Sequence, residues 1–447
     1  MISLLRILSK LLAAGIMAVA AIATSLPLGA TVLAKAPVTI EFWHSEVEQE
    51  RQRVIGELIK KFEQENPGIT VKVLAIEEND LRTKLTTAVA VRKLPNVISS
   101  SSEMTLRMGD ANLLNTQAAN GLIDEMGLSN FYQGGLKMVS NPKGGYYAVP
   151  YTGWVQGIWY RKDWFTQKGL EPPTTWDAIL KAAKTFNDAD NRVYGIIIGT
   201  SRDLYAEQVF TQIALSNGAH LFSDSGKVDF NTPEMVEALR FYRELAKYTP
   251  PGPETWRDAR DLYLNGTVAM MFYSTFIMDD IGIGRTGFKG AIVPNLVDKT
   301  GFAPYVGHTA KASFGAVSSY GITSSSTPEQ VEAAKKFIRF LMRKDNYIKF
   351  MHVSPGGFNP MLKQVAASAE FVDEPILKTW GQTYSTIASG LDSIETFGTR
   401  DGRVFPSYGN ISAQLIIGEA LNNMTERDWT PEQTAQWAQN RMEQAVK

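Results

Sequence analysis

Apolar positions after the N-terminal segment recur with two different periods. Short runs alternate apolar and polar residues, which is typical of a half-buried strand, and longer runs carry apolar residues at helical spacing. The predicted elements are strands at 38–42, 69–76 and from 94 onwards, and helices at 46–65 and 80–92. This alternation favours βαβ units with a parallel sheet. Ligands bind at the carboxyl ends of such strands, so residues 43–46 and 99–103 are candidates for a binding site.

The rest of the chain continues the alternation. Helices are predicted from 175, 233 and 328 and at 412–424 and 431–447, and strands at 194–198 and 268–272. Thr232 followed by Pro233 is typical of a helix start, because a Thr hydroxyl caps the first turn and proline is tolerated at its first position. A chain of 447 residues exceeds one ordinary core. It shows no repeat and no long linker, which predicts two interleaved domains.

Aromatic residues are concentrated in the segment 144–165, which holds four Tyr and three Trp residues but only three charged ones. Tyr151 and Trp154 stand next to Pro150 and Gly153, and these neighbours favour a bend with side chains that face outward. Exposed rings suit a flat and weakly polar ligand. We therefore interpret the segment as a surface on which a sugar ring stacks.

Residues 1–36 have the order of a cleaved secretory signal peptide. Arg6 and Lys10 precede an uncharged, mostly apolar run, and small residues follow it, so cleavage is expected after Ala34 or Ala36. The alternative is a membrane anchor, but the apolar run is shorter than the roughly 20 residues that span a bilayer. The sequence contains no Cys, which excludes disulfides and a lipid-modified Cys. We expect a periplasmic protein that is not a lipoprotein.

Composition and charge narrow the possible functions. Hydrophobic residues make up 44% of the chain and charged residues 20%, as in a folded globular protein. A formal net charge of -1 gives no field that would attract nucleic acid. No P-loop or G-x-S-x-G motif occurs, and the G-x-G-x-x-G match at 282–287 lacks the strand and helix of a dinucleotide site. The four His residues are scattered, so we predict no metal site and no cofactor.

A secreted glycoside hydrolase is the alternative from another class. It needs two carboxylates at a defined separation across the sugar. The available acids are Glu46, Glu48, Glu50, Glu103 and Asp163. No pair among them meets the requirement by inspection, and we interpret the adjacent acids Asp279 and Asp280 as a solvated surface pair or a helix cap. We therefore predict no catalytic residue and expect the chain not to be an enzyme.

Several short motifs occur in the order in which a known family has them. They are 62–71 (FEQENPGITV), 94–97 (LPNV), 146–150 (YYAVP), 159–163 (WYRKD), 172–177 (PPTTWD), 264–270 (LNGTVAM) and 333–341 (AAKKFIRFL). With these motifs the chain resembles the family 1 extracellular solute-binding proteins, the sugar receptors of bacterial ABC importers. The resemblance spans essentially the whole mature chain. It departs at Asn96, where the family usually has Asp.

The resemblance implies an α/β fold of two lobes, each a mainly parallel sheet flanked by helices, joined by hinge crossovers. Lobe 1 would comprise residues 37–151 and 316–365, and lobe 2 residues 152–315 and 366–447. The lobes would close on a sugar by rotation about the hinge. The crossover at 151–154 would then serve as a hinge strand and as a wall of the binding site.

The resemblance also places ligand contacts on positions of this chain. The predicted substrate-binding residues are Trp43, His44, Glu46, Glu50, Ser101, Glu103, Tyr151, Thr152, Trp154, Tyr273, Ser274, Phe276, Ser318, Gly357, Phe358, Arg403 and Tyr408. Ser101 stands where the family frequently has Asp, and Ser274 and Phe276 stand where it often has Trp. Rings can stack on the apolar faces of a sugar while acids and amides bind its hydroxyls, so most of these residue types suit a sugar.

Within the family, the chain is most similar to cyanobacterial receptors for compatible-solute glycosides such as glucosylglycerol, sucrose and trehalose. The small residue Ser274 is consistent with a small ligand. The alternatives are a maltodextrin receptor with a longer groove and, in another binding class, a polyamine or peptide receptor. The expected partners are a sugar or glycoside and the membrane permease of an ABC importer. We expect a monomer that does not bind nucleic acid.

Overall fold

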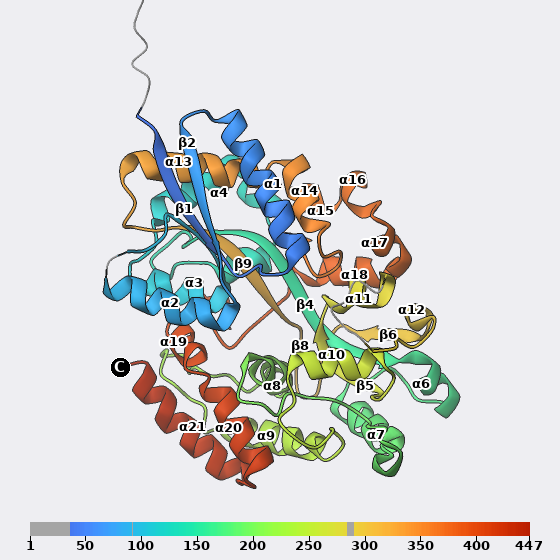
Figure 1. Ribbon diagram of the computed structural model, residues 1–447. Helices are drawn as coiled ribbons and strands as arrows, with labels where there is room; N and C mark the ends of the chain where they lie inside the picture. Colours follow the sequence, from blue (N-terminus) through green and yellow to red (C-terminus); the bar gives the residue numbers. More distant parts are fainter. Residues whose placement is uncertain (1–35, 92, 284–289) are drawn as a thin grey trace, which may run out of the picture. The chain divides into compact units, whose positions relative to one another are not determined.

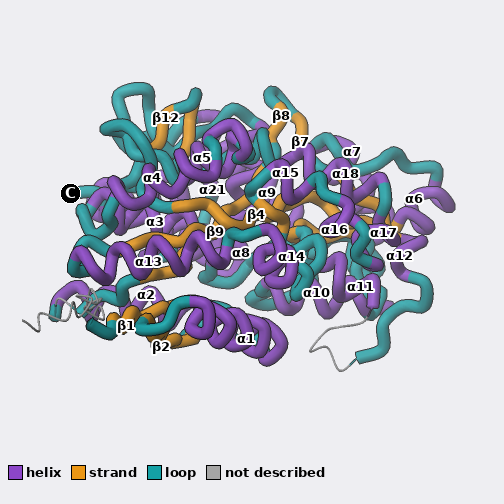
Figure 2. Tube along the Cα trace, turned by 90° about the horizontal axis from the view of Figure 1, so that it is seen from above, coloured by secondary structure: helices purple, strands orange, loops and turns teal. Residues whose placement is uncertain are grey.

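Eight strands form one mixed sheet, with helices on both of its faces (Figure 1; Figure 2). The computed structural model describes residues 36–91, 93–283 and 290–447. The strands are β1 (Val38–His44), β2 (Ile69–Ala75), β3 (Val97–Ser101), β4 (Val149–Arg161), β5 (Met270–Ser274), β6 (Thr300–Ala303), β7 (Val306–Gly307), β8 (Lys311–Ala312), β9 (Phe314–Ile322), β10 (Asn359–Pro360), β11 (Thr399–Arg400) and β12 (Arg403–Val404). The sheet order is β10-β4-β9-β3-β1-β2, and β5 and β6 also pair with β4.

The helices predicted at 46–65 and 80–92 and from 175, 233, 328 and 431 begin within three residues of those positions, and further helices lie between them. They are α1 (Gln49–Glu65), α2 (Glu78–Ala90), α3 (Ser102–Asp110), α4 (Thr116–Met126), α5 (Gln133–Met138), α6 (Lys162–Lys168), α7 (Trp176–Phe186), α8 (Leu204–Ser216), α9 (Pro233–Ala246), α10 (Trp256–Leu264), α11 (Ile277–Ile283), α12 (Leu296–Lys299), α13 (Pro328–Leu341), α14 (Lys344–Met351), α15 (Lys363–Ala366), α16 (Ala369–Val372), α17 (Pro375–Trp380), α18 (Gln382–Gly390), α19 (Tyr408–Ala413), α20 (Ile416–Glu426) and α21 (Pro431–Ala445). The Thr232 hydroxyl caps α9 by accepting a hydrogen bond of 3.2 Å from the Met235 N–H. The helix predicted at 412–424 is divided into α19 and α20 by Leu415, whose φ of 55° lies in the left-handed region.

Among the described residues, parallel ladders between strands occur only in the first three strands. β1 pairs in parallel with β2 and with β3, because α1 and α2 carry the chain back to the same end of the sheet. The other pairs of this sheet are antiparallel, among them β3–β9, β4–β9 and β4–β5. The expectation of a mainly parallel sheet in each lobe is therefore wrong in this detail. Residues 194–198, predicted as a strand, make only isolated parallel bridges, of Tyr194 to Val268 and of Ile197 to Met271.

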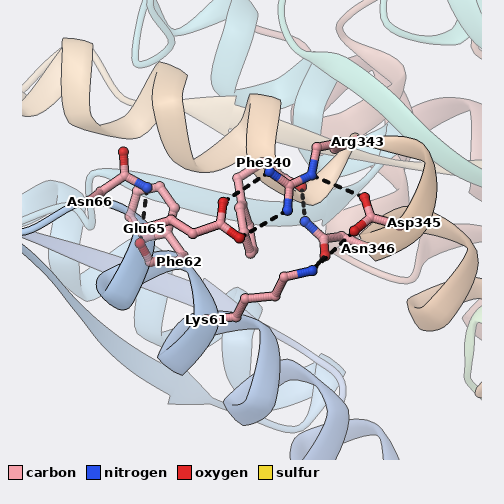
Figure 3. A network of polar contacts seen from close by, with 8 residues as sticks. All are labelled: Lys61, Phe62, Glu65, Asn66, Phe340, Arg343, Asp345 and Asn346. Carbon is pink, nitrogen blue, oxygen red and sulfur yellow. Dashed lines mark hydrogen bonds and ion pairs between the residues drawn. The ribbon is translucent and has the colours of Figure 1, made fainter.

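The C-terminal end of α1 is held against the start of α14 by a network of polar contacts (Figure 3). The Arg343 guanidinium binds both carboxylate oxygens of Glu65, at 2.9 and 3.1 Å, and Lys61 Nζ lies 3.0 Å from Asp345 Oδ2. Exposed ion pairs of this kind contribute about 1 kcal/mol or less each. The fully buried Phe62 ring adds apolar packing beneath them. Together these contacts fix α1, which directly follows the carboxyl end of β1.

The residues from Val38 to Lys447 form one compact unit. A large hydrophobic core surrounds β4, and a smaller one lies around Trp43, α2 and α3. Within the described residues no helix is long and apolar enough to cross a membrane. Two predictions fall outside what the structure describes, namely the signal peptide, except for its last residue, and the part of the G-x-G-x-x-G match from Gly284 onwards.

Candidate functional site

The aromatic segment around Tyr151 belongs to a long buried strand and not to an exposed bend. Residues 149–161 form β4, and all of them except Trp154 are buried. The Tyr151 ring stacks on the Tyr320 ring with centroids 3.9 Å apart, and its hydroxyl lies 2.9 Å from Ser99 Oγ. Burial raises the pKa of Tyr151. The expectation that this ring faces outward is therefore wrong, since the residue is 1% exposed.

The register between β4 and β9 changes at this point. Pro150 pairs with Ser319 and Thr152 pairs with Ser318, so that Tyr151 has no partner on β9. Proline offers no N–H to a ladder and is found at such irregularities. The extra residue in β4 explains why Tyr151 lies in the core although its neighbours in sequence are typical of a turn.

Four strands of the sheet are buried except for one residue each, which is partly exposed. These positions are Ser101 on β3, Ser318 on β9, Trp154 on β4 and Ser274 on β5, and all other residues of these strands are buried. Ser101 pairs with Ser318, Ser318 pairs with Thr152, and Ser274 pairs with Gln156. Paired residues, and residues two apart on one strand, share a face of the sheet. The four positions therefore form a row on one face, which we call the exposed row.

His44 and Glu46 follow from β1 on the same side. His44 is 1% exposed, and its Nδ1 accepts a hydrogen bond of 3.1 Å from the Glu46 N–H. Burial lowers the pKa of His44 to about 4, so the imidazole is neutral at pH 7. With Ser99 and Tyr151 these two residues line a cavity of about 10 Å³, which is close to the space that one water molecule needs. His44 is therefore a neutral group at pH 7 whose ring is held in place by the Glu46 N–H.

Arg51 was not predicted from the sequence, yet it joins three predicted residues. Its Nη1 lies 2.8 Å from Glu46 Oε2. Its guanidinium carbon lies 5.3 Å from the centre of the Phe276 ring and 4.9 Å from that of Phe358. The two rings pack edge to face, and Gly357 allows this because a Cβ there would lie 2.3 Å from Phe276. Arg51, on the first turn of α1, thus links Glu46 at the end of β1 to the Phe276 and Phe358 rings.

The acidic pair, Asp279 and Asp280, is buried and not solvated as the sequence suggested. The two residues are 9% and 8% exposed and belong to α11, directly after β5. The Ser354 hydroxyl donates a hydrogen bond of 3.0 Å to Asp279 Oδ2. Burial, and then the charge of Asp279, raises the pKa of Asp280 to about 7. The sequence signal was present, because two acids follow closely on the carboxyl end of a strand.

Tyr273 lies near the acidic pair. It is 5% exposed, and burial and the charge of Asp280 raise its pKa. Its carbonyl accepts a hydrogen bond of 3.0 Å from Trp159 Nε1. Tyr273 therefore positions the end of β5, from which Ser274 and Phe276 follow.

Three predicted residues point away from these groups. Trp43 lies in the smaller core with α2 and α3, because it faces the opposite side of β1 from His44. Glu50 is exposed and pairs with Arg53 at 2.6 Å. Arg403 is exposed on β12 and lies 3.3 Å from Asp224 Oδ1. The roles of Trp43, Glu50 and Arg403 in ligand binding stay predictions.

The remaining predicted residues lie where other elements meet. Thr152 is buried and donates a hydrogen bond of 3.3 Å to the Asn359 carbonyl. The Tyr408 hydroxyl donates a hydrogen bond of 2.6 Å to Glu207 Oε1. Glu103 is partly exposed in the first turn of α3, which packs closely on α19. A Cβ at Gly409 would lie 2.4 Å from the Glu103 carbonyl oxygen, so glycine permits this approach.

The described residues contain no group of His, Cys, Asp and Glu that could hold a metal ion. Arginine, carboxylates, hydroxyls and aromatic rings are instead the groups that surround the exposed row. These groups can bind hydroxyls through charge-assisted hydrogen bonds and can stack on apolar faces. The arrangement is typical of a binding site for a polyhydroxy solute.

Residues 57–379 match the family model of bacterial extracellular solute-binding proteins. The match covers more than half of the chain, and the chain therefore belongs to this family. Its members are binding proteins, which confirms the prediction that the chain is not an enzyme. The narrower resemblance to cyanobacterial receptors stays a prediction.

Individual relatives agree with this assignment. YcjN of Escherichia coli K12, a putative ABC transporter periplasmic-binding protein, is 35% identical over 414 residues, which are 92% of this chain and 94% of the relative. A mannitol-binding protein of Pseudomonas aeruginosa is 28% identical over 260 residues, 55% of this chain and 56% of the relative. A solute-binding protein of Agrobacterium radiobacter K84 in complex with ribitol has a TM-score of 0.74 at 23% identity, over 92% of this chain and 99% of that one. The structural match confirms the two-lobed α/β fold.

Proposed function

We propose that the protein is the periplasmic sugar-binding component of an ABC importer and captures a small glycoside or disaccharide, such as glucosylglycerol, trehalose or sucrose. Membership of the family and the name of the Escherichia coli relative support the transport role. The exposed row carries the proposal for the ligand, because it leaves one Trp ring and three Ser hydroxyls accessible on an otherwise buried sheet face.

The chemistry of the row suits a sugar. Trp154 offers an apolar platform for the C–H face of a ring, and stacking of this kind adds to the burial of apolar area. Ser101, Ser318 and Ser274 donate and accept hydrogen bonds at fixed positions. Glu46 and Arg51 lie at the carboxyl end of β1 and provide charged partners for hydroxyls.

The size of the ligand follows from the residue types in the row. A single Trp platform with short side chains around it matches one or two sugar rings better than the long groove of a maltodextrin receptor. The mannitol-binding relative makes a linear polyol the second candidate. A polyol would use the same hydroxyl partners but would gain less from Trp154, because it has no ring face.

Capture and delivery would follow the hinge mechanism of the family. We propose lobe 1 as 37–151 with 316–365 and lobe 2 as 152–315 with 366–447, so that β4 and β9 cross between them. Contacts available only in the closed form drive closure around the solute. The closed protein then docks on the membrane permease as a monomer, after a signal peptide at 1–36 has directed it to the periplasm.

A ligand screen with the purified mature protein tests the proposal. Glucosylglycerol, trehalose, sucrose, maltose and mannitol are added separately, and the melting temperature is recorded, since a ligand of the native state raises it. Isothermal titration calorimetry then gives the affinity of each solute that shifts the melting temperature. We expect glucosylglycerol, trehalose or sucrose to give the largest shift.

Two Trp variants separate stacking from general destabilisation. Trp154→Ala is expected to weaken sugar binding about tenfold to 100-fold, which corresponds to one lost stacking platform. Trp437→Ala is the matched control. Trp437 is also partly buried, but it lies on α21, where its ring packs on that of Trp429, and it is not among the predicted substrate-binding residues. Equal affinities in both variants would contradict the role of Trp154, and the absence of any shift with all five solutes would overturn the proposed function.

A further inference from the structure

Trp256, the first residue of α10, is the most exposed Trp among the described residues. It is 36% exposed, whereas a Trp ring is largely buried in most folded proteins. The start of its helix is held in place, because Asp258 Oδ2 accepts hydrogen bonds of 2.9 Å from the Thr255 N–H and of 2.6 Å from the Thr255 hydroxyl. A large flat ring thus stands at a fixed position where another molecule can reach it.

The Trp256 ring lies on the core-facing side of α10. Ala259 and Tyr263 follow it at three and seven positions along the helix, and both are fully buried. Residues at this spacing share one face of a helix. Because helical side chains lean towards the N-terminus, the Trp256 ring extends the buried side of α10 beyond the beginning of the helix. Its exposure therefore does not come from a place on the outer face.

Hydrogen bonds attach the start of α10 to the end of the segment 194–198. The Thr200 N–H donates to the Glu254 carbonyl at 3.2 Å, and the Glu254 N–H donates to Thr200 Oγ1 at 2.8 Å. This segment makes parallel bridges along β5, and α10 packs on β5 (Figure 1). The carboxyl ends of parallel neighbours lie at the same edge, which is the edge where ligands bind. Trp256, two residues after Glu254, therefore stands at the edge where β5 ends in Ser274.

Trp154 lies beyond the same edge. β4 and β5 are antiparallel, and Gln156 pairs with Ser274, the last residue of β5. Trp154 precedes Gln156 by two residues, so it lies about 7 Å past the end of β5. The segment 194–198 borders β5 on the side opposite to β4. Trp154 and Trp256 thus flank the end of β5 from its two sides.

Two arginines lie beside the Trp256 ring. The guanidinium carbon of Arg257 is 4.2 Å from the ring centre, and that of Arg260 is 5.5 Å from it. Cation–π attraction of this kind orients the ring. Guanidinium groups also donate hydrogen bonds to hydroxyl oxygens. An apolar platform with donors at its rim suits a sugar ring, whose faces carry C–H groups and whose edge carries hydroxyls.

We propose that Trp256 is a second stacking platform of the binding site, and that the site therefore selects a solute with two sugar rings, one on Trp154 and the other on Trp256. The inference rests on the proposed function and deepens it, because it selects disaccharides among the proposed ligands. Each stacked ring adds apolar burial and aromatic contact to the binding free energy. A solute with one ring, such as glucosylglycerol, occupies only one of the two platforms.

The test compares solutes that have one ring with solutes that have two. Trehalose and sucrose provide two rings, and glucosylglycerol and methyl α-glucoside provide one. Each solute is titrated calorimetrically into the full mature chain. We expect the tighter-binding disaccharide to bind the wild type at least about tenfold more tightly than either one-ring solute, as one additional stacked ring would give.

Variants of Trp256 assign this advantage to the second platform. Trp256→Ala is expected to weaken binding of the disaccharide about tenfold and binding of the one-ring solutes less than about twofold, so that the advantage disappears. Trp256→Tyr keeps an aromatic ring and should retain most of the advantage. Trp437→Ala is the matched control, because Trp437 packs on Trp429 at α21, and it should keep the wild-type ratio. Melting curves verify that all three variants are folded.

The outcomes separate the inference from the proposed function. A one-ring solute or mannitol that binds the wild type as tightly as the disaccharides overturns the second platform and leaves solute binding intact. A ratio that is unchanged in Trp256→Ala also overturns it. The same holds if Trp256→Ala weakens both classes of solute equally, since the residue would then not act on a second ring. If no solute of the screen binds, the proposed function itself fails.

Discussion

The exposed row and the acidic pair differ in how far the polar groups around them are satisfied by other groups of the protein. Behind the exposed row, hydroxyl groups form a closed set of contacts. Ser99 Oγ lies 2.9 Å from the Tyr151 hydroxyl, and Thr105 Oγ1 lies 2.9 Å from Ser100 Oγ and 2.8 Å from Ser319 Oγ. All five side chains are buried, so these bonds replace the water that folding removed.

The region of the acidic pair is different. Among the described residues Asp280 has no hydrogen bond or close ion pair, and the buried Thr275 Oγ1 has no hydrogen-bond partner either. Leaving such groups unpaired costs free energy in the unliganded protein. The comparison teaches that the strand hydroxyls are satisfied inside the protein, whereas Thr275 and Asp280, between β5 and α11, find no hydrogen-bond partner among the described residues.

Loss of the Tyr151 ring should have the largest effect on stability. Tyr151→Ala removes a fully buried ring and its stack on Tyr320, and we expect the free energy of unfolding to fall by about 5 kcal/mol. Urea unfolding followed by circular dichroism measures it. Tyr151→Phe keeps the stack and removes the hydroxyl that contacts Ser99, so it should cost about 1 kcal/mol. If Tyr151→Ala lowered the free energy of unfolding by less than about 1 kcal/mol, the ring would not be part of the core.

Asp280→Asn should do the opposite and stabilise the unliganded protein. The folded-state pKa of Asp280 is raised to about 7 from its usual 3.8, so ionisation destabilises the fold as the pH rises through this range. At pH 8 we expect the variant to be more stable than the wild type by up to about 4 kcal/mol, with little difference at pH 4. Urea unfolding of both proteins at the two pH values checks this. Equal stability at pH 8 would mean that the carboxylate is already satisfied.

His44 should give a smaller effect with the reverse pH dependence. Its pKa is lowered to about 4 in the folded state, so acidification from pH 6.5 towards pH 4 favours the unfolded chain by up to about 3 kcal/mol. His44→Gln removes this titration and should therefore lose less stability than the wild type over that interval. The measurement is the change in unfolding free energy between pH 7 and pH 4.5. A parallel loss in both proteins would contradict a buried, neutral His44.

Part of the fold could be predicted from local patterns. The apolar face of α1 buries Val54, Leu58 and Phe62 as the helical spacing indicates, and the Thr232 cap begins α9 at Pro233. These features depend on residues a few positions apart, which is the range over which periodicity and capping act. The rule that ligands bind at strand ends also selected residues 43–46 and 99–103, of which His44 and Ser101 lie on one face of the sheet. Their role in ligand binding stays a prediction.

Other features of the site could not be predicted locally. The sequence around Arg51 is typical of an exposed first turn of a helix and gives no sign of a site. Only the tertiary structure brings its guanidinium next to the Phe276 and Phe358 rings. The acidic pair was assigned to solvent because most adjacent acids are solvated. Its burial arises from Ser354 and the surrounding elements, which lie far away in the chain.

The aromatic segment at 144–165 shows most clearly which features the local sequence determines and which ones depend on the tertiary structure. Its composition alone indicated that aromatic rings matter there, and the order of secondary structure and the family motifs were sufficient for the class of protein. Only the tertiary structure decided that Tyr151 is a core residue and that Trp154 is accessible. The cause is a register change against β9, a strand that lies far along the chain, and pairing between such distant segments leaves no local periodicity to detect.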